Sequence, residues 1–334
     1  MTRPPCGVAP ALDVEGLAAE LERALPGRVE RGLRVAELST YRLGGPVAVV
    51  VRVGCEADLE PVAAAVARHA PPLLVIGRGS NLLVADTGFA GLGLVLDREL
   101  EALALPGGAA GATDAVVRAG AGLALPVLAR RVAAAGLTGL EFFVGIPGSV
   151  GGAVRMNAGG HGRETRDVLV AARTCDLTAG GTVGERRAED LALDYRHSAL
   201  TPTEVVTGAT FRVAPDAPAE CEERVAEIVR WRREHQPGGA NAGSVFRNPP
   251  GDAAGRLIDA CGLKGYRVGG AHVSEKHANF FQADAGATAA DVRRLVFDVR
   301  ARVAAETGVL LTPELQMVGF DDDATGAVRS GGGE

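Results

Sequence analysis

The sequence lacks most of what membrane proteins and nucleic-acid-binding proteins depend on. No apolar run reaches the roughly 18 residues that cross a bilayer, and the opening MTRPPCGVAP has no apolar signal core. The net charge of −6 at pH 7 leaves no dominant basic face for nucleic acid or a membrane surface. We therefore predict no nucleic-acid partner and no membrane insertion, and a phosphate-bearing ligand would need local cations.

Cysteine is also scarce, and no repeat of solenoid length is present. The five cysteines are odd in number, scattered and free of CxxC or Cys/His metal spacing: Cys6, Cys55, Cys175, Cys221 and Cys261. This pattern predicts reduced thiols in a cytoplasmic protein without a metal site. With 334 residues and 47% hydrophobic content, the chain can bury a large core in two or three domains.

The first third of the chain predicts an α/β start. Residues 13–25 have the apolar spacing of a helix, and 47–53 (VAVVVRV) has the β-branched composition of a strand covered on both faces. A helix over 56–69 and strands at 73–77 and 92–96 are expected to follow.

A glycine-rich turn follows the strand at 73–77, formed by Gly77, Arg78, Gly79, Ser80 and Asn81. Its free amides and nearby guanidinium could hold a pyrophosphate. The turn matches neither a Walker motif nor GxGxxG, so an ordinary strand-to-loop turn remains the alternative.

The stretch GLEFFVGIPGSVGGAVRMNAGG, residues 139–160, predicts a wrapped loop, because glycine is unfavourable in helices and central strands. Gly145, Gly148, Gly151 and Gly152 would give positive φ, and Pro147 would stiffen the turn. Apolar residues interrupt the glycines, so a buried loop whose amides bind a ligand is favoured over a long surface loop.

The middle of the chain predicts strands at 116–120, 168–174, 183–186 and 205–213, with a helix at 123–135 that turns Val127, Leu128 and Val132 inward. After residue 215 the composition changes, and charged and apolar residues predict helices at 219–234, 253–261 and 289–307, the last capped by Thr288. An interrupted strand is expected at 310–320, and the tail 321–334 is predicted to be disordered.

Seven of these segments occur in one order and together resemble a known family. They are TYRLGGPV, IGRGSNLL, GLEFFVGIPGSVGGAV, LDYRHSAL, NAGSVFRNP, SEKHANFF and LTPELQ. The chain is similar, over about residues 39–319, to the UDP-N-acetylenolpyruvoylglucosamine reductases of peptidoglycan synthesis.

The resemblance implies an α+β fold with a two-part FAD-binding domain of the vanillyl-alcohol-oxidase (PCMH) type and a C-terminal α/β substrate-binding domain. The implied divisions are a helical segment at 1–37, the FAD-binding domain at 38–215 with subdomains at about 38–100 and 101–215, the substrate domain at 216–320 and the tail. Tightly bound FAD, NADPH as reductant and a UDP-sugar substrate are implied, in an enzyme expected to be monomeric.

The resemblance also assigns residues. FAD would be held by Gly77, Arg78, Gly79, Ser80, Asn81, Gly145, Ile146, Pro147, Gly148, Ser149, Gly151, Gly152, Asn157 and Gly159. Substrate would contact Tyr195, His235, Arg247 and Asn248. The catalytic residues would be Arg196, Ser244 and Glu314.

The implied reaction transfers hydride from FAD N5 to the enolpyruvyl group, with a proton from Ser244. Arg196 offers a fixed fork for the substrate carboxylate, and Glu314 beside that carboxylate should have a raised pKa. Taken alone, Ser244 is more often a turn residue, and Arg196 and Glu314 are more often surface charges. His235, His272 and His277 are given no catalytic role.

The chain departs from the family pattern at several positions. His235 and Arg247 stand where lysines are usual, and Gly160-His161 stands where Ala-Tyr is common, which leaves open what covers that side of the flavin. The long insertion of one branch, between Asn248 and Leu257, is absent. Two other functions remain open: a flavoprotein of this fold that oxidises a small alcohol or sugar, and a non-catalytic protein that binds flavin or a nucleotide sugar.

Overall fold

The computed structural model describes residues 12–106 and 115–320. Its first sheet is built on β2 (Pro46–Val53), whose β-branched side chains are buried on both faces, as predicted. The strand order is β1-β2-β5-β3, in which β1 is antiparallel to β2 and the others are parallel. The other elements of this unit are α1 (Val14–Ala24), β1 (Val29–Arg34), η1 (Val35–Glu37), η2 (Glu56–Asp58), α2 (Leu59–His69), β3 (Leu73–Ile76), β4 (Leu82–Val84), β5 (Phe89–Leu96) and η3 (Arg98–Glu101).

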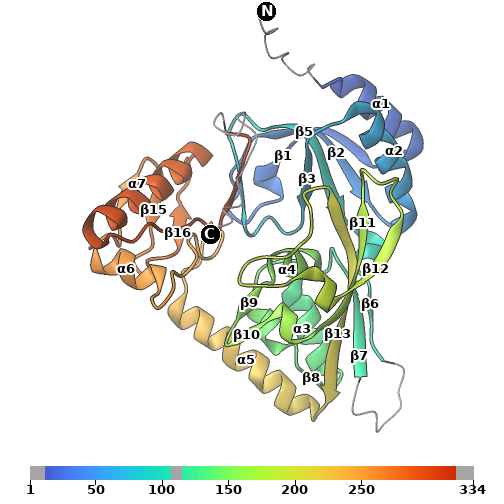
Figure 1. The fold of residues 1–334 in the computed structure, drawn as a ribbon. Coiled ribbons are helices and arrows are strands. Elements are labelled where there is room, and N and C mark those ends of the chain that lie inside the picture. Colours follow the sequence, from blue (N-terminus) through green and yellow to red (C-terminus); the bar gives the residue numbers. More distant parts are fainter. Residues whose placement is uncertain (1–11, 107–114, 321–334) are drawn as a thin grey trace, which may run out of the picture.

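A second, antiparallel sheet of six strands has the order β12-β11-β13-β7-β6, with β8 paired to β13. Helices α3, α4 and α5 lie beside it (Figure 1). Its elements are β6 (Leu103–Ala104), β7 (Ala115–Gly120), α3 (Leu125–Ala134), β8 (Leu137–Thr138), η4 (Glu141–Gly145), α4 (Val150–Met156), β9 (Gly159–Gly160), β10 (Arg163–Glu164), η5 (Thr165–Asp167), β11 (Leu169–Asp176), β12 (Val183–Arg187), η6 (Ala188–Leu191), β13 (Glu204–Pro215) and α5 (Pro218–His235).

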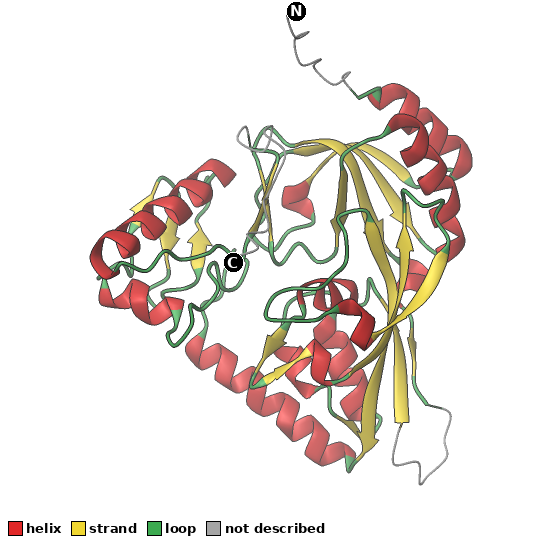
Figure 2. Cartoon of the chain, viewed as in Figure 1, coloured by secondary structure: helices red, strands yellow, loops and turns green. Residues whose placement is uncertain are grey.

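The C-terminal unit packs two helices on a small antiparallel sheet, with a separate core (Figure 2). Its elements are α6 (Ala254–Ala260), β14 (Arg267–Val268), β15 (Ala271–Val273), β16 (Phe281–Ala283), α7 (Ala289–Thr307) and β17 (Gln316–Val318). Thr288 caps α7 in a capping box with Asp291, and the predicted inward face of α7 is fully buried. The α+β fold class is confirmed.

Packing divides the chain differently from the predicted boundaries. Cys221 and Val225 of α5 are buried in the core of the second sheet, so α5 packs with that unit and not with the C-terminal unit predicted to begin at 216. Strand β1, which the sequence did not predict, joins the first sheet, so 1–37 is more than a helical segment.

The C-terminal unit is docked on the first unit by a two-stranded ladder and by side-chain bonds to main-chain groups. Strand β17 pairs in parallel with β4, and the buried Tyr41 hydroxyl donates to the Phe281 carbonyl at 3.1 Å. Both carboxylate oxygens of Asp86 accept from amides at the start of α7, those of Ala289 and Ala290.

Several local predictions were wrong. Residues 150–156 form helix α4 and not a loop, because Ser149 caps it and Gly151 fits against Ala121, where a Cβ would lie 3.0 Å from the Ala121 Cβ. None of the four glycines expected to have positive φ does, whereas Gly139 does (118°). Val127 faces outward, and of the expected last strand only 316–318 form a strand, with Pro313 in an isolated bridge to Phe246. The predicted disordered tail lies outside the described residues.

Candidate active site

A four-residue turn in the second unit, Asp194 to His197, carries the first candidate catalytic residue. Main-chain bonds run both ways between Asp194 and His197, at 3.1 and 3.0 Å. Arg196 has φ of 54° in this turn, a left-handed conformation that costs an L-residue about 1–2 kcal/mol. Because such strain persists only when surrounding contacts fix it, the turn is a candidate functional element.

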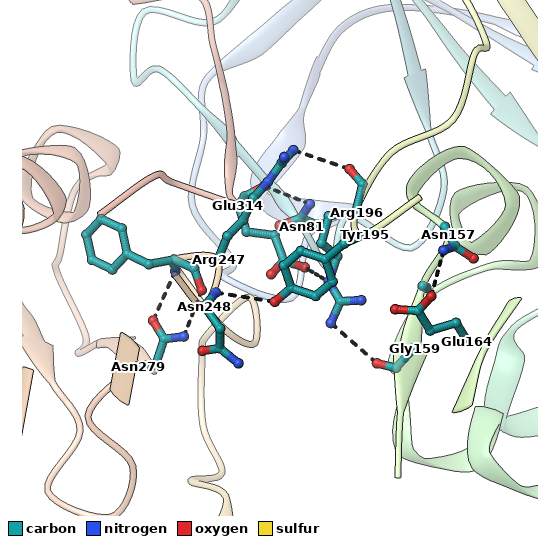
Figure 3. Close-up of polar contacts among 12 residues, drawn as sticks. Asn81, Asn157, Gly159, Glu164, Tyr195, Arg196, Arg247, Asn248, Asn279 and Glu314 are labelled. Atoms are coloured by element: carbon teal, nitrogen blue, oxygen red, sulfur yellow. Dashed lines mark hydrogen bonds and ion pairs between the residues drawn. The ribbon is translucent and has the colours of Figure 1, made fainter. Parts of the chain in front are cut away.

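The Arg196 guanidinium meets Glu314 of the C-terminal unit (Figure 3). The Arg196 Nε donates to the Glu314 Oε1 at 2.6 Å, and both side chains are more than four-fifths buried. Burial raises the pKa of Glu314 above its usual 4.5, while the charges of Arg196 and Arg247 oppose that rise. The direction is the one predicted for Glu314, but its principal cause here is burial, and the predicted effect of a substrate carboxylate stays a prediction.

Two further contacts join the same turn to the C-terminal unit. The Arg247 Nη2 donates to the Arg196 carbonyl at 3.2 Å, and the Asn248 amide donates to the Tyr195 hydroxyl at 3.3 Å. The Arg196 guanidinium also lies over the Tyr195 ring, 5.0 Å from its centroid. Four of the predicted site residues therefore join Glu314 in one cluster, with two guanidinium groups around one buried carboxyl.

Ser244 lies on a segment that is hydrogen-bonded to the segment carrying Glu314. The Glu314 amide donates to the Val245 carbonyl at 2.7 Å, and Ser244 itself forms a bridge with Phe280. The Asn279 side chain fixes this segment, because its amide and carbonyl bond both main-chain groups of Phe246. Sequence reasoning missed Asn279, although it belongs to the SEKHANFF motif.

A cavity of about 440 Å³ opens beside Ser244 in the C-terminal unit. Its lining includes Asn248, His277, Lys264 and Lys276, and these last two are the only lysines in the printed sequence. Burial and the nearby charge of Lys264 lower the pKa of His277, so the ring is neutral at pH 7. The scarcity of lysine in the sequence could have drawn attention to Lys264 and Lys276, to which the family motifs gave no role.

His235 lies at the end of α5, within an aromatic group. Its Nδ1 is 2.8 Å from the Trp231 carbonyl, and its ring stacks on the Trp231 indole at 4.6 Å. His161, which stands where the family commonly has tyrosine, forms an edge-to-face contact with the same indole.

Asn157 and Gly159 support the turn that carries Arg196. The Asn157 amide donates to the Asp194 carbonyl and to Glu164, each at 3.0 Å, and its carbonyl accepts from the Arg166 amide at 2.9 Å. Gly159 accepts from the Arg196 Nη2 at 3.5 Å. Asn157 is fully buried, so its observed contacts are with the protein.

The two glycine-rich segments assigned to FAD, residues 77–81 and 145–152, face each other. A Cβ on Gly77 would lie 2.4 Å from the Ser149 Oγ, and one on Gly148 would lie 3.6 Å from the Ser80 Oγ. Gly79 has φ of 58° and is packed against Ser39. The Asn81 side chain donates to the Glu314 carbonyl at 3.1 Å, which connects the first segment to the catalytic cluster.

Two family models match the chain: FAD binding domain over residues 47–185, and UDP-N-acetylenolpyruvoylglucosamine reductase, C-terminal domain, over residues 235–318. A curated UDP-N-acetylenolpyruvoylglucosamine reductase from Rhodopseudomonas palustris (strain HaA2) is 42% identical over 311 residues, which cover 91% of this chain and 96% of the relative. The chain belongs to the UDP-N-acetylenolpyruvoylglucosamine reductase family.

Other members of the reductase family agree. The Thiobacillus denitrificans reductase is 44% identical over 84% of this chain and 89% of its own length. The crystal structure of the Thermus caldophilus reductase has a TM-score of 0.74 and 36% identity, and covers 87% of this chain and 98% of that chain. The predicted family and the two-part FAD-binding fold are confirmed, and the chain is an FAD-dependent oxidoreductase.

The residues present fit FAD. Gly77 and Gly148 add no side chain of their own where the two segments meet, and the side chains beside them there include the Ser149 and Ser80 hydroxyls, so main-chain amides and hydroxyls could together hold a pyrophosphate. Among residues 12–106 and 115–320, no group of His, Cys, Asp and Glu side chains could hold a metal ion. Over the same residues, no helix is long and apolar enough for a membrane span.

Proposed function

We propose that the protein reduces the enolpyruvyl group of UDP-N-acetylenolpyruvoylglucosamine to give UDP-N-acetylmuramate, with NADPH as reductant. The relatives carry the name of this reductase. The observation that carries the proposal is the Arg196–Glu314 pair at 2.6 Å, with Arg247 beside it, where two guanidinium groups meet one carboxyl of raised pKa.

Arg196 and Arg247 supply the charge that an enolpyruvyl carboxylate requires. With Glu314 ionised the cluster carries a net charge of +1, and with Glu314 protonated it carries +2, so it favours a bound anion in either state. A guanidinium held in place before the substrate binds also stabilises the charge that develops next to the carboxylate during reduction.

FAD, when bound and reduced by NADPH, supplies the hydride for the β-carbon of the double bond. Ser244 then donates a proton to the α-carbon, which completes the saturated product. A serine hydroxyl is a weak acid, but proton transfer from a positioned group typically contributes 10²–10⁴-fold. Burial raises the pKa of Glu314, which favours the protonated form, and in that form its carboxyl donates a hydrogen bond to the enolate oxygen.

The diphosphate arm of the substrate would extend along the cavity next to Ser244. Lys264 and Lys276 supply cations there, although Lys264 is also paired with Asp259 at 2.7 Å. Asn248 keeps its side-chain amide for the ligand, because its carbonyl accepts from the Ala254 amide. His235 is the further predicted contact, at the end of α5.

All of these residues come from one chain, so we expect a monomer to be sufficient, acting in the cytoplasm where the nucleotide substrates are present. We also propose three units, with the C-terminal unit beginning near residue 235, after α5. The separate sheets of the first two units and the packing of α5 against the second unit support this division.

Anaerobic titration of the purified protein tests the proposal. The flavin absorbance should bleach with NADPH and return with the enolpyruvyl UDP sugar, and with no other sugar nucleotide. Reoxidation by oxygen coupled to oxidation of a small alcohol or sugar would favour the second function. A yellow protein that does not turn over NADPH would favour the binding protein.

A further inference from the structure

Arg196 occupies a position that its own backbone disfavours. Its φ of 54° is in the region where glycine is usual, and it is the residue that carries the guanidinium facing Glu314. A small rotation of this peptide would swing the whole side chain, because the guanidinium lies at the end of a long arm. Something must therefore hold the peptide of Arg196 itself.

The main-chain bonds between Asp194 and His197 close the turn but do not contact the carbonyl of Arg196, and the other contacts act elsewhere. Asn157 holds the carbonyl of Asp194, and the Asn248 amide holds the ring of Tyr195. The bond to Glu314 holds the side chain of Arg196, and its bond to Gly159 is long at 3.5 Å. The Arg196 carbonyl is held by the Nη2 of Arg247, at 3.2 Å (Figure 3).

Arg247 is itself well anchored in the C-terminal unit. Its amide donates to the Thr312 carbonyl at 2.9 Å, and the preceding Phe246 is fixed by Asn279 at both main-chain groups. Its Nε is buried without a hydrogen-bond acceptor among the described residues, so within that part of the chain its contact with the Arg196 carbonyl is made by Nη2 alone.

We propose that Arg247 is a positioning residue for Arg196. By donating to the Arg196 carbonyl it keeps the turn left-handed, so that the Arg196 guanidinium faces Glu314 before substrate arrives. The inference rests on the proposed reduction and refines the expected role of Arg247, which acts through Arg196 more than through the substrate. Because a misplacement of about 1 Å in a catalytic group can cost about 100-fold, the effect on rate should be large.

A double-mutant comparison tests this assignment. Arg247→Met is measured in the wild-type chain and in Arg196→Gly, in which glycine adopts the left-handed conformation freely and no guanidinium remains to be positioned. The readout is the single-turnover rate at which the enolpyruvyl UDP sugar reoxidises the reduced flavin. We expect Arg247→Met to slow this rate about 10–100-fold in the wild-type chain and less than about 3-fold in Arg196→Gly.

An equal factor in the two backgrounds would overturn the proposal, because Arg247 would then contact substrate independently of Arg196. So would a wild-type rate in the single variant. Arg247→Lys, which keeps one donor for the carbonyl, should recover the rate to within about tenfold. If Arg247→Met does not fold, Arg247→Lys is compared in the two backgrounds, and any slowing that it causes in the wild-type chain should disappear in Arg196→Gly.

The matched control is Arg302→Met, which removes a guanidinium stacked on Tyr266, away from the cluster. It should leave the reoxidation rate unchanged, and flavin content and thermal midpoint show whether each variant is folded. Failure of the wild-type protein to be reoxidised by the sugar nucleotide would count against the proposed function, whereas normal wild-type reoxidation with equal factors would count against Arg247 alone.

Discussion

The C-terminal unit meets the rest of the molecule at two interfaces of different character. Against the first unit it uses the parallel β17–β4 ladder, the buried Tyr41 hydroxyl and the Asp86 cap of α7. Against the second unit it uses Arg196–Glu314, Arg247–Arg196 and Asn248–Tyr195, all from one strained turn. The first interface contains a main-chain ladder, and its side chains bond only main-chain groups, whereas the second is built around an ion pair between two side chains.

The difference indicates how the molecule separates stability from chemistry. The β17–β4 ladder and the Tyr41 hydroxyl bond fix the C-terminal unit on the first unit, and their polar groups are already hydrogen-bonded to each other, so few of them can bind a ligand. The polar contacts at the turn hold groups that a substrate can engage. Changes at the docking interface should therefore alter stability more than rate, and changes at the catalytic interface should do the reverse.

The largest effect on rate is expected for Ser244→Ala. Flavin reduction by NADPH should stay within about twofold, while reoxidation by the enolpyruvyl substrate should slow about 10²–10⁴-fold, because the proton donor is lost. Stopped-flow absorbance measures both half-reactions in one preparation. Ser244→Cys, which keeps a donor, should recover part of the rate, and equal damage to both half-reactions would contradict the assignment.

Glu314 should show the next largest effect. Glu314→Ala leaves two buried guanidinium groups without their carboxyl and should slow reoxidation about 10²–10³-fold, the size expected for loss of one transition-state donor. Glu314→Gln keeps an acceptor for the Arg196 Nε and a donor for the substrate, so it should stay within about tenfold of wild type. If the two variants were equally slow, Glu314 would be needed as a carboxylate and not as an acid.

Tyr41→Phe tests whether a change at the docking interface lowers stability without slowing the reaction. Loss of the hydroxyl leaves the Phe281 carbonyl unpaired in a buried setting, which should lower the free energy of unfolding by about 1–3 kcal/mol. Both half-reactions should stay within about twofold of wild type. The free energy of unfolding in urea and the two rates are measured on each variant. Tyr266→Phe, at a partly buried tyrosine within the C-terminal unit, is the control. A large loss of rate without loss of stability would break the contrast between the interfaces.

The raised pKa of Glu314 also predicts a pH dependence of stability. A carboxyl whose pKa is higher in the folded chain contributes stability that is fully present below about pH 4.5 and is lost as pH rises through the folded-state value. The stability of the wild type relative to Glu314→Gln should therefore fall as pH rises from 4.5 toward neutrality, by about 1.4 kcal/mol for each unit of the shift. A difference that grows with pH over this range would show that the Arg196 charge outweighs burial.

Much of this arrangement was predictable where local chemistry sets the outcome. The β-branched run of β2, the cap of α7 at Thr288 and the apolar face of that helix follow from residue type and spacing. Family motifs indicated Arg196 and Glu314, which lie 118 residues apart in the chain and are in direct contact in the structure.

What escaped prediction depends on tertiary contacts. Glycine composition argued against helix α4, but Ser149 and close packing on Ala121 stabilise it. The composition change at residue 215 suggested a domain boundary, yet Cys221 and Val225 pack into the second unit. The left-handed conformation of Arg196 was not predicted, because the local bonds between Asp194 and His197 are joined by supports from Arg247 and Asn157, which lie far from it in the sequence.

The smallest effect is expected for Tyr195→Phe, which removes the bond from the Asn248 amide but keeps the ring beneath the Arg196 guanidinium. At 3.3 Å and with Tyr195 partly exposed, this bond should be worth about 0.5–1.5 kcal/mol, which corresponds to a two- to tenfold slower reoxidation. Tyr195→Leu should be slower still, because it removes the ring as well. The comparison of the two variants separates the hydroxyl bond that spans the interface from the ring contact within the turn. If Tyr195→Phe lowered stability and left reoxidation unchanged, the turn would resemble the docking interface, and the contrast between the two would no longer hold.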